Sequence, residues 1–202
     1  MILERNDLPS DFFAGVPSVA IDTETMGLLP HRDRLCLAQF SRENGDSIIV
    51  RFENYDEAVN IRNLLQNQNI LKIFHYARFD IMMLYKYLNS MAQNVYCTKI
   101  ASKLSRTYTQ KHSLADLCRE LLSIEISKEQ TCTDWGAEDL TSKQLEYAAT
   151  DVIYLHKIKA KLDIMLAREN RLGLAEGCFK FLETRVALDL LAGESYDIFS
   201  HG

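Results

Sequence analysis

Five side chains in three short motifs are of the types that metal-dependent chemistry uses. They are Asp22, Glu24, Asp80, Tyr147 and Asp151. Four carboxylates that converge on one point repel one another strongly unless cations lie between them. The set therefore predicts a site for divalent metal ions, and such a site indicates phosphate chemistry.

The spacing of the first two acids indicates that they share one side of a strand. Side chains at positions i and i+2 of a strand point to the same face, so Asp22 and Glu24 project together while Thr23 points to the other face. Apolar Val19 and Ile21 precede them. We expect the acids at the carboxyl end of this strand, where ligands tend to bind in α/β sheets. Taken alone, the pair is also compatible with the acids of a solvated loop.

The other two motifs fall on predicted helices. Asp80 follows a buried strand and lies in the first turn of the next helix, where an acid also complements the helix dipole. Tyr147 and Asp151 are four residues apart, so they lie on one face of a helix. A core tyrosine beside a surface aspartate is an alternative interpretation of that pair. No single motif decides the matter, whereas the order of the three along the chain does.

The elements that carry these motifs predict an α/β domain. Apolar and β-branched runs predict strands over 18–24, 34–41, 47–52 and 70–74, with a hairpin turn at 44–46. Apolar spacing and capping signals predict helices over 55–66, from about 77, over 113–122 and from 141 onward. This order predicts a mixed sheet flanked by helices, in one domain over 1–202. A further helix over about 176–192 closes the core or forms an oligomer interface.

The composition argues against several classes of protein. The 202 residues carry a formal net charge of −5, which disfavours tight, sequence-independent binding to long nucleic acid. No apolar run approaches the roughly 20 residues of a membrane span, so we expect a cytoplasmic protein that does not contact membranes. The five cysteines include no CxxC pair, which favours reduced, buried thiols.

A basic stretch interrupts this acidic chain. No acidic residue occurs from Ile81 to Ala115. The same stretch contains Lys86, Lys99, Lys103, Arg106, Lys111 and His112. A local basic face on an acidic protein suits a small anionic ligand. A chance gap in the acids on a solvated face explains the stretch as well.

Together, the three motifs resemble those of the DEDDy exonucleases, in the RNase D branch of the RNase H-like superfamily. The match extends to the segments Ala20–Leu28, Asp33–Gln39, Cys97–Ser102 and His112–Leu117. The resemblance implies an RNase H-like (DnaQ-type exonuclease) fold. RNase D itself continues into helical nucleic-acid-binding domains. A compact chain without them resembles nanoRNase C, the small-oligoribonucleotide nuclease of that branch.

The resemblance also implies a two-metal-ion mechanism with Mg²⁺ or Mn²⁺, which are hard cations that match a carboxylate cluster. It implies that Asp22 bridges both ions and that Glu24 and Asp151 bind the ion on the side of the nucleophile. Asp80 then acts mainly at the other ion, through water. Tyr147 orients the attacking water, because a tyrosine with an ordinary pKa near 10 is a poor base at neutral pH.

Substrate contacts are predicted from several places in the chain. Backbone groups around Thr25, Met26 and Gly27 follow the catalytic strand and are expected to bind the terminal nucleotide. By resemblance, Leu28 wedges against bases, although a core leucine after a turn fits the sequence equally well. Other candidates for contacts to a phosphate or base are His75, Arg78, Lys103, Arg106, Lys111 and His112. The last four are expected to cap the 5′ phosphate of a short substrate, while His75 is also compatible with a structural histidine at a strand end.

The function predicted from these observations is a metal-dependent 3′–5′ exoribonuclease. It degrades short single-stranded RNA, down to dinucleotides, to 5′-monophosphates. A general RNase D-like exonuclease that trims longer or structured RNA is the alternative, and an inactive nucleic-acid-binding scaffold is a third interpretation. The resemblance further implies a homo-oligomer, in the form of a closed ring of eight.

Overall fold

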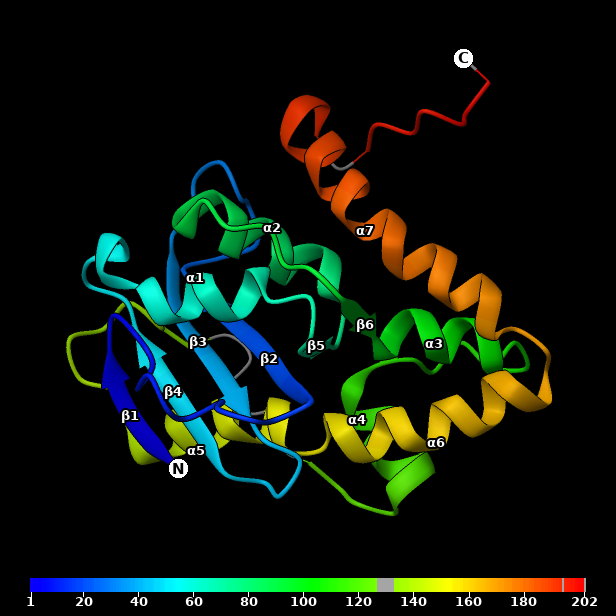
Figure 1. Cartoon of the computed structure of the whole chain (residues 1–202), viewed down its shortest axis with the longest axis horizontal. Helices are drawn as coiled ribbons and strands as arrows, with labels where there is room; N and C mark the ends of the chain where they lie inside the picture. Colours follow the sequence, from blue (N-terminus) through cyan, green and yellow to red (C-terminus); the bar gives the residue numbers. More distant parts are fainter. Residues whose placement is uncertain (127–132, 194, 202) are drawn as a thin grey trace.

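The computed structural model describes residues 1–126, 133–193 and 195–201, and within these ranges it contains one six-stranded sheet (Figure 1). The strands are β1 (Ile2–Arg5), β2 (Ser18–Thr25), β3 (Leu35–Ser41), β4 (Ser47–Arg51), β5 (Leu71–Phe74) and β6 (Val95–Cys97). Their order across the sheet is β1-β4-β3-β2-β5-β6. β2 is therefore an interior strand, with neighbours on both sides.

The sheet is mixed, as the sequence predicts. β3 runs antiparallel to both of its neighbours, β2 and β4, and the turn between β3 and β4 contains Gly45 at a φ of 91°, which glycine adopts without strain. β5 runs parallel to β2, and β6 runs parallel to β5. The carboxyl ends of β2, β5 and β6 therefore lie at the same end of the sheet, where β5 and β6 lead into the helices that follow and β2 leads into a loop before β3.

Helices cover both faces of the sheet (Figure 1). They are α1 (Val59–Gln66), α2 (Ala77–Leu88), α3 (Thr98–Ser105), α4 (Leu114–Leu117), α5 (Ser142–Ile153), α6 (Leu155–Arg168) and α7 (Leu172–Ala192). Val19 and Ile21 of β2 pack with α1 and α2 on one face, whereas Ala20 packs with α6 on the other. α5 covers β3 and β4 on the second face. The two helices α3 and α7 lie beyond the β6 edge and contact each other.

The predicted capping signals occur in the structure. At the start of α5, the amide of Gln144 donates to Thr141 Oγ1 over 3.3 Å, and Gln144 Oε1 accepts from the amide of Thr141 over 2.9 Å. Ser113 and Asp116 form the same reciprocal pair at the start of α4. Each pair satisfies two amides that have no partner within the helix, so the first turn of α5 is well defined before it reaches Tyr147.

The structure differs from the sequence prediction at several elements. The helix predicted over 55–66 is broken at Ala58, whose ψ of 53° separates a 3₁₀ turn from α1. The helix predicted over 113–122 continues past α4 only as a π turn over Cys118–Leu122. The strands β1 and β6 were not predicted, because four and three residues are too short to show alternation.

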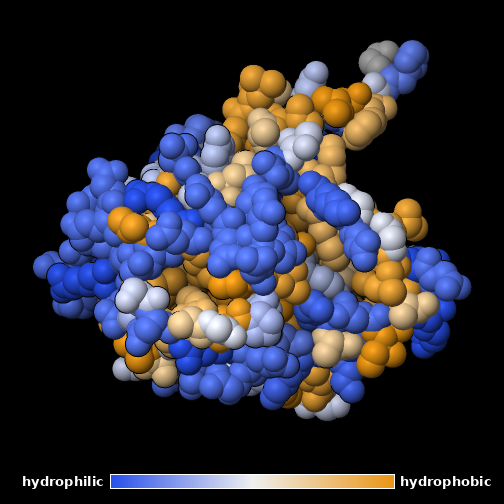
Figure 2. Space-filling model, in the orientation of Figure 1, coloured by the Kyte–Doolittle hydropathy of each residue, from blue (hydrophilic) through white to orange (hydrophobic). Residues whose placement is uncertain are grey.

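The C-terminal helix is longer than the predicted 176–192, since α7 begins at Leu172. Leu182 and Val186 of α7 are buried against the core, whereas Leu191 is 81 % exposed. Figure 2 shows apolar side chains gathered at the C-terminal end of α7 and along the segment that follows it. Within the described ranges, no helix has both the length and the apolar character needed to cross a membrane.

The prediction of buried thiols holds for three of the five cysteines. Cys36, Cys97 and Cys118 are buried and unpaired, whereas Cys178 is exposed, contrary to the prediction. Cys178 lies on α7, on a side of the helix that the core does not cover. Cys132 falls outside the described residues.

Candidate active site

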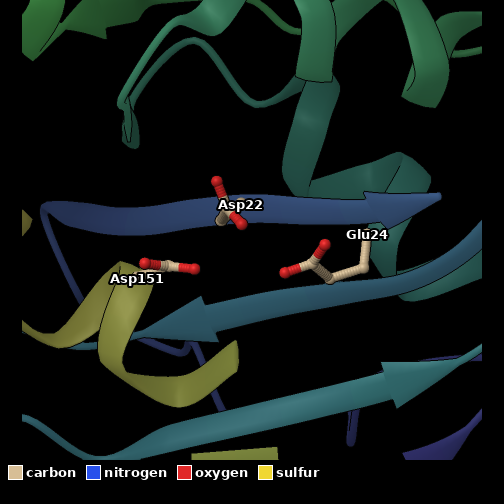
Figure 3. Close-up of side chains that lie close together, drawn as sticks. All are labelled: Asp22, Glu24 and Asp151. Atoms are coloured by element: carbon tan, nitrogen blue, oxygen red, sulfur yellow. The ribbon is translucent and has the colours of Figure 1, made fainter. Parts of the chain in front are cut away.

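Three of the predicted metal ligands meet at the middle of the sheet. Asp22 and Glu24 project from the same face of β2, and Asp151 approaches them from α5 (Figure 3). Each residue offers one carboxylate oxygen, and these oxygens all lie within 4.8 Å of one another. An all-oxygen donor set of this kind fits Mg²⁺ or Mn²⁺ and does not resemble the sulfur and nitrogen donors of zinc sites.

Asp80 reaches the same region from the other face of β2. It lies in the first turn of α2, as predicted, and its residue is only 4 % exposed. Thr23 donates a hydrogen bond from Oγ1 to Oδ1 of Asp80 over 2.7 Å. Thr23 does point away from Asp22 and Glu24, as the strand spacing predicts, and this direction is what brings it to Asp80. Asp80 is thus outside the group of three close oxygens, which is consistent with a role through water.

The acids raise the pKa of one another. Burial raises the pKa of Asp22 well above its usual value, and the three neighbouring carboxylates raise it further. Burial likewise raises the pKa of Glu24, and the charges of Asp151 and Asp80 add to the effect. Without a cation, folding therefore brings these carboxylates together at a cost in free energy, from desolvation and from their mutual repulsion.

Two further pKa values show which contacts oppose this effect. Burial raises the pKa of Asp80 to about 7, although the hydrogen bond from Thr23 favours the ionised form. Burial also raises the pKa of Asp151 to about 7, and the hydrogen bond from Tyr147 opposes the rise. The hydroxyl of Tyr147 therefore points at the acidic cluster, as a residue that orients water there must do.

The loop after β2 lies beside the cluster and is tightly folded. Thr25 Oγ1 donates to the carbonyl of Gly27 over 2.5 Å. The buried carboxylate of Asp33 accepts a hydrogen bond from the amide of Leu29 over 2.9 Å. A Cβ on Gly27 would lie 2.3 Å from Asp33 Oδ2, so the loop requires glycine here. Because Leu28 is 78 % exposed, the structure favours a surface contact over a core leucine at this position.

Met26 connects this loop to the segment before α5. A Cβ on Gly136 would lie 2.3 Å from the sulfur of Met26, so the two segments pack closely. Trp135, which is 4 % exposed, lies in that segment and packs against Tyr147. The side-chain Nε2 of Gln144 donates to the carbonyl of Asp134 over 3.2 Å and so ties the segment to α5.

The structure places His75 and Arg78 in structural contacts. Thr98 donates its hydroxyl hydrogen to the carbonyl of Phe74, so Nδ1 of His75, 2.9 Å from Thr98 Oγ1, is the donor in that pair. Burial lowers the pKa of His75 to about 3, which keeps its ring neutral. Arg78 forms two hydrogen bonds with Asp189 of α7. These contacts favour the structural interpretation of His75.

The four basic candidates after α2 separate into two groups. Arg106 is fully buried, and its guanidinium binds Glu120 and the carbonyl of Lys111. His112 is 8 % exposed, and its Nδ1 lies 2.8 Å from Ser102 Oγ. Lys103 and Lys111 are exposed. Lys103 lines a cavity of about 290 Å³ together with Tyr76 and Arg78 of the second motif. Arg106 and His112 are not open to solvent, so a direct phosphate contact is favoured only for the two lysines.

Two residues of the site were not assigned a function from the sequence. The strand period does predict that Thr23 points to the sheet face opposite Asp22 and Glu24. It does not predict the partner of Thr23, because that depends on which helix covers the face. Trp135 carries a weaker signal as the single tryptophan of the chain. Neither residue belongs to a motif of acids.

Comparison with known proteins identifies the family. The profile of a family described as 3′–5′ exonuclease matches residues 4–167, which is most of the chain. The chain belongs to this 3′–5′ exonuclease family. Among curated members, DNA polymerase I of Aquifex aeolicus is 34 % identical over 171 residues, and Ribonuclease D of Nitrobacter hamburgensis is 27 % identical over 161 residues. The chain covers 27 % and 41 % of these two exonuclease relatives, so it spans less than half of their length.

Solved structures match all or most of the chain. NrnC of Brucella melitensis is 51 % identical with a TM-score of 0.96, and the match covers 100 % of this chain and 98 % of NrnC. That protein has also been solved with bound Mg²⁺ and bound to pGG, at TM-scores of 0.94 and 0.95. Escherichia coli RNase D, at 23 % identity and a TM-score of 0.77 over 88 % of this chain and 47 % of its own, shares the fold. The RNase H-like, DnaQ-type fold is confirmed.

Proposed function

We propose that the protein is a metal-dependent 3′–5′ exoribonuclease that degrades short oligoribonucleotides, down to dinucleotides, to 5′-monophosphates. The observation that carries the proposal is the convergence of Asp22, Glu24 and Asp151 oxygens within 4.8 Å. Membership of the 3′–5′ exonuclease family supports the reaction. The likeness to NrnC, which was solved bound to pGG, supports the short substrate.

The residues of the site have separate tasks in this proposal. Asp22, Glu24 and Asp151 would hold two divalent cations, and Asp80 would act at one of them through water. When bound, the ions supply a water of lowered pKa and stabilise the charge on the leaving oxygen.

Tyr147 would orient the attacking water, since its hydroxyl already points at Asp151. The water oxygen forms the new bond to phosphorus, and the bond from phosphorus to the 3′ oxygen breaks. The 3′ oxygen takes up a proton, and the terminal nucleotide leaves as a 5′-monophosphate.

The loop over 25–28 would bind the terminal nucleotide, with exposed Leu28 against a base. Lys103 and Lys111 would contact the 5′ phosphate of a short substrate. Both lysines are exposed, and Lys103 lines the cavity at the start of α2. A contact to one 5′ phosphate favours short substrates, because an acidic protein cannot bind many phosphates of a long one.

A length series tests the proposal directly. Wild-type protein receives 5′-labelled RNAs of about two to twenty nucleotides with Mg²⁺ or Mn²⁺, and the rates are compared. We expect a steep preference for the dinucleotide and no hydrolysis by the variant Asp22→Asn. Equal rates at all lengths would instead favour general trimming, the activity class of the RNase D relatives. Full metal-dependent activity in Asp22→Asn or Asp151→Asn would overturn the enzyme assignment.

We also propose that the protein is a cytoplasmic homo-oligomer, in the form of a ring of eight. The exposed apolar residues at the end of α7 and after it support an interface, since Leu191 and Phe199 are 81 % and 78 % exposed. Mass measurement in solution tests the assembly: a monomer at micromolar concentration would contradict it.

A further inference from the structure

The first turn of α2 carries Asp80 but has an unusual beginning. The helix follows Tyr76, whose φ of 68° is in the left-handed region, and no side chain caps it. An ordinary N-cap contributes about 1 kcal/mol and fixes the first turn, so this turn depends on other contacts. Its placement matters, because Asp80 must face the cluster of acids on β2.

Contacts on two sides hold this turn. From the sheet, Thr23 donates to Oδ1 of Asp80 over 2.7 Å. From α7, the carboxylate of Asp189 accepts two hydrogen bonds from Arg78, over 2.5 Å to Nε and 2.7 Å to Nη2. Arg78 and Asp80 are two positions apart, so they point to opposite sides of the helix. The first turn of α2 is therefore clamped between β2 and α7.

The pair between Asp189 and Arg78 is suited to fix a position. The Asp189 side chain has no exposed surface, and a two-pronged pair of a guanidinium with a carboxylate restricts both distance and angle. Arg185 binds the same carboxylate over 2.7 Å, but it lies one turn away on α7 itself. Arg78 therefore couples the position of α7 to the first turn of α2, whereas the pair of Arg185 with Asp189 lies within α7.

We propose that Asp189 is a positioning residue of the active site, which holds Arg78 and thereby the first turn of α2 where Asp80 can serve a metal ion. The inference rests on the metal-binding function proposed above. α7 lies beyond residues 4–167, the part that the family profile matches. The exonuclease fold therefore receives this support from a helix outside its matched region.

Mn²⁺ binding to the protein without RNA tests the inference. Calorimetric titrations compare wild type, Asp189→Asn, Asp80→Asn and Arg185→Gln at a temperature where circular dichroism shows each to be folded. We expect Asp189→Asn to weaken Mn²⁺ binding about tenfold, which is typical when a contact that supports a metal ligand is lost. The weakened site should be the same one that Asp80→Asn weakens. Asp189→Glu, which keeps the charge, should recover part of the affinity.

Arg185→Gln is the matched control. Arg185 and Arg78 have similarly exposed side chains, at 18 % and 26 %, and both bind Asp189. The ion pair of Arg185 with Asp189 lies within α7, so its loss should not move α2. We therefore expect Arg185→Gln to bind Mn²⁺ as wild type does. An equal loss in both variants would show general loosening of α7 and would overturn the proposal, as would normal Mn²⁺ affinity in folded Asp189→Asn.

A second variant decides the matter if Asp189→Asn does not fold. Arg78→Lys keeps the positive charge but cannot make the two-pronged contact. Weaker Mn²⁺ binding by Arg78→Lys supports the proposal, and unchanged binding overturns it. Because no RNA is present, a contact of Arg78 with substrate cannot affect this result. Wild-type protein that binds Mn²⁺ but does not hydrolyse RNA would overturn the proposed function and leave this inference standing.

Discussion

The indole ring of Trp135 packs against the phenol ring of Tyr147, with the ring centroids 6.1 Å apart and 36° between the ring planes. The contact joins the segment before α5 to the helix that carries the third motif. Trp135 is buried, so it restricts the rotation of the Tyr147 ring on one side. The hydroxyl of Tyr147 is thereby kept near Asp151.

Removal of that hydroxyl should affect the reaction and spare metal binding. We expect Tyr147→Phe to lower kcat on a dinucleotide about 100-fold, the lower part of the range for a group that acts on the proton or water of a reaction. Mn²⁺ affinity should stay unchanged, because the four acids remain. Tyr154→Phe, a partly exposed tyrosine at the end of α5, is the control and should have normal kcat. Normal kcat in Tyr147→Phe would contradict the role of Tyr147.

The metal-free protein should lose stability as the pH rises through the cluster's titration. Burial raises the pKa of Asp80 and Asp151 from 3.8 to about 7 in the folded state. Each group then binds its proton more tightly when folded than when unfolded, so the free energy of unfolding falls between about pH 4 and about pH 7. In the presence of a chelator, this contribution lowers Tm as the pH rises across that window.

A variant isolates this contribution from other acids, since the lowered pKa values of Asp33 and Asp116 act in the opposite direction. We expect Asp22→Asn to have a higher Tm than wild type at about pH 8, and a smaller Tm difference at about pH 5. Each kcal/mol of repulsion and desolvation that the substitution removes should raise Tm by roughly 2–4 °C. Saturating Mg²⁺ should raise the wild-type Tm at the higher pH. The exposed variant Asp46→Asn serves as the control, and an equal Tm gain there would contradict the explanation.

Leu28 should contribute to substrate binding and hardly to stability. Its side chain is 78 % exposed beside the cluster, so Leu28→Ala leaves no cavity and should leave Tm unchanged. If Leu28 packs on a base, its loss costs about 1 kcal/mol and raises KM for a dinucleotide about fivefold, with kcat unchanged. Leu174→Ala, at 62 % exposure on α7, is the comparison and should change neither KM nor kcat. An unchanged KM in Leu28→Ala would exclude the wedge.

The basic stretch should divide into residues that bind substrate and residues that stabilise the fold. Lys103→Ala should raise KM for RNA with a 5′ phosphate more than for RNA without one, because the exposed lysine contributes charge alone. Arg106→Ala should lower stability, since it removes a fully buried side chain together with its hydrogen bonds and its ion pair with the partly exposed Glu120. Chemical denaturation and steady-state kinetics on both variants separate the two effects. Equal KM values for the two RNAs in Lys103→Ala would argue against a phosphate contact.

The sequence predicts the parts of the site that depend on local periodicity. The strand period places Asp22 and Glu24 together, and the capping box at Thr141 sets the start of the helix that carries Tyr147 and Asp151. Both features follow from residues within one element. The mixed sheet follows from the order of such elements, which is why it was predicted without β1 and β6.

Local periodicity and capping signals do not predict contacts between elements that are far apart in the sequence. A gap in acidic residues shows net charge but not exposure, so it cannot separate buried Arg106 from exposed Lys111. Arg106 is buried because Glu120, 14 residues later, supplies its partner. The pair of Arg78 with Asp189 spans 111 positions and depends on how α7 folds back over α2. Pairs of this kind need the packed structure.

The acids of this site come from both sides of one strand. Asp22, Glu24 and Asp151 lie on the face that α5 covers, whereas Asp80 is bound to Thr23 on the face of α2. Metal ions bound by all four acids would therefore join two helical layers that the sheet otherwise keeps apart. The site would then act as a cross-link as well as a reaction centre. Chelation would release both layers at once, and slow opening of one layer would weaken the hold on the metal from the other.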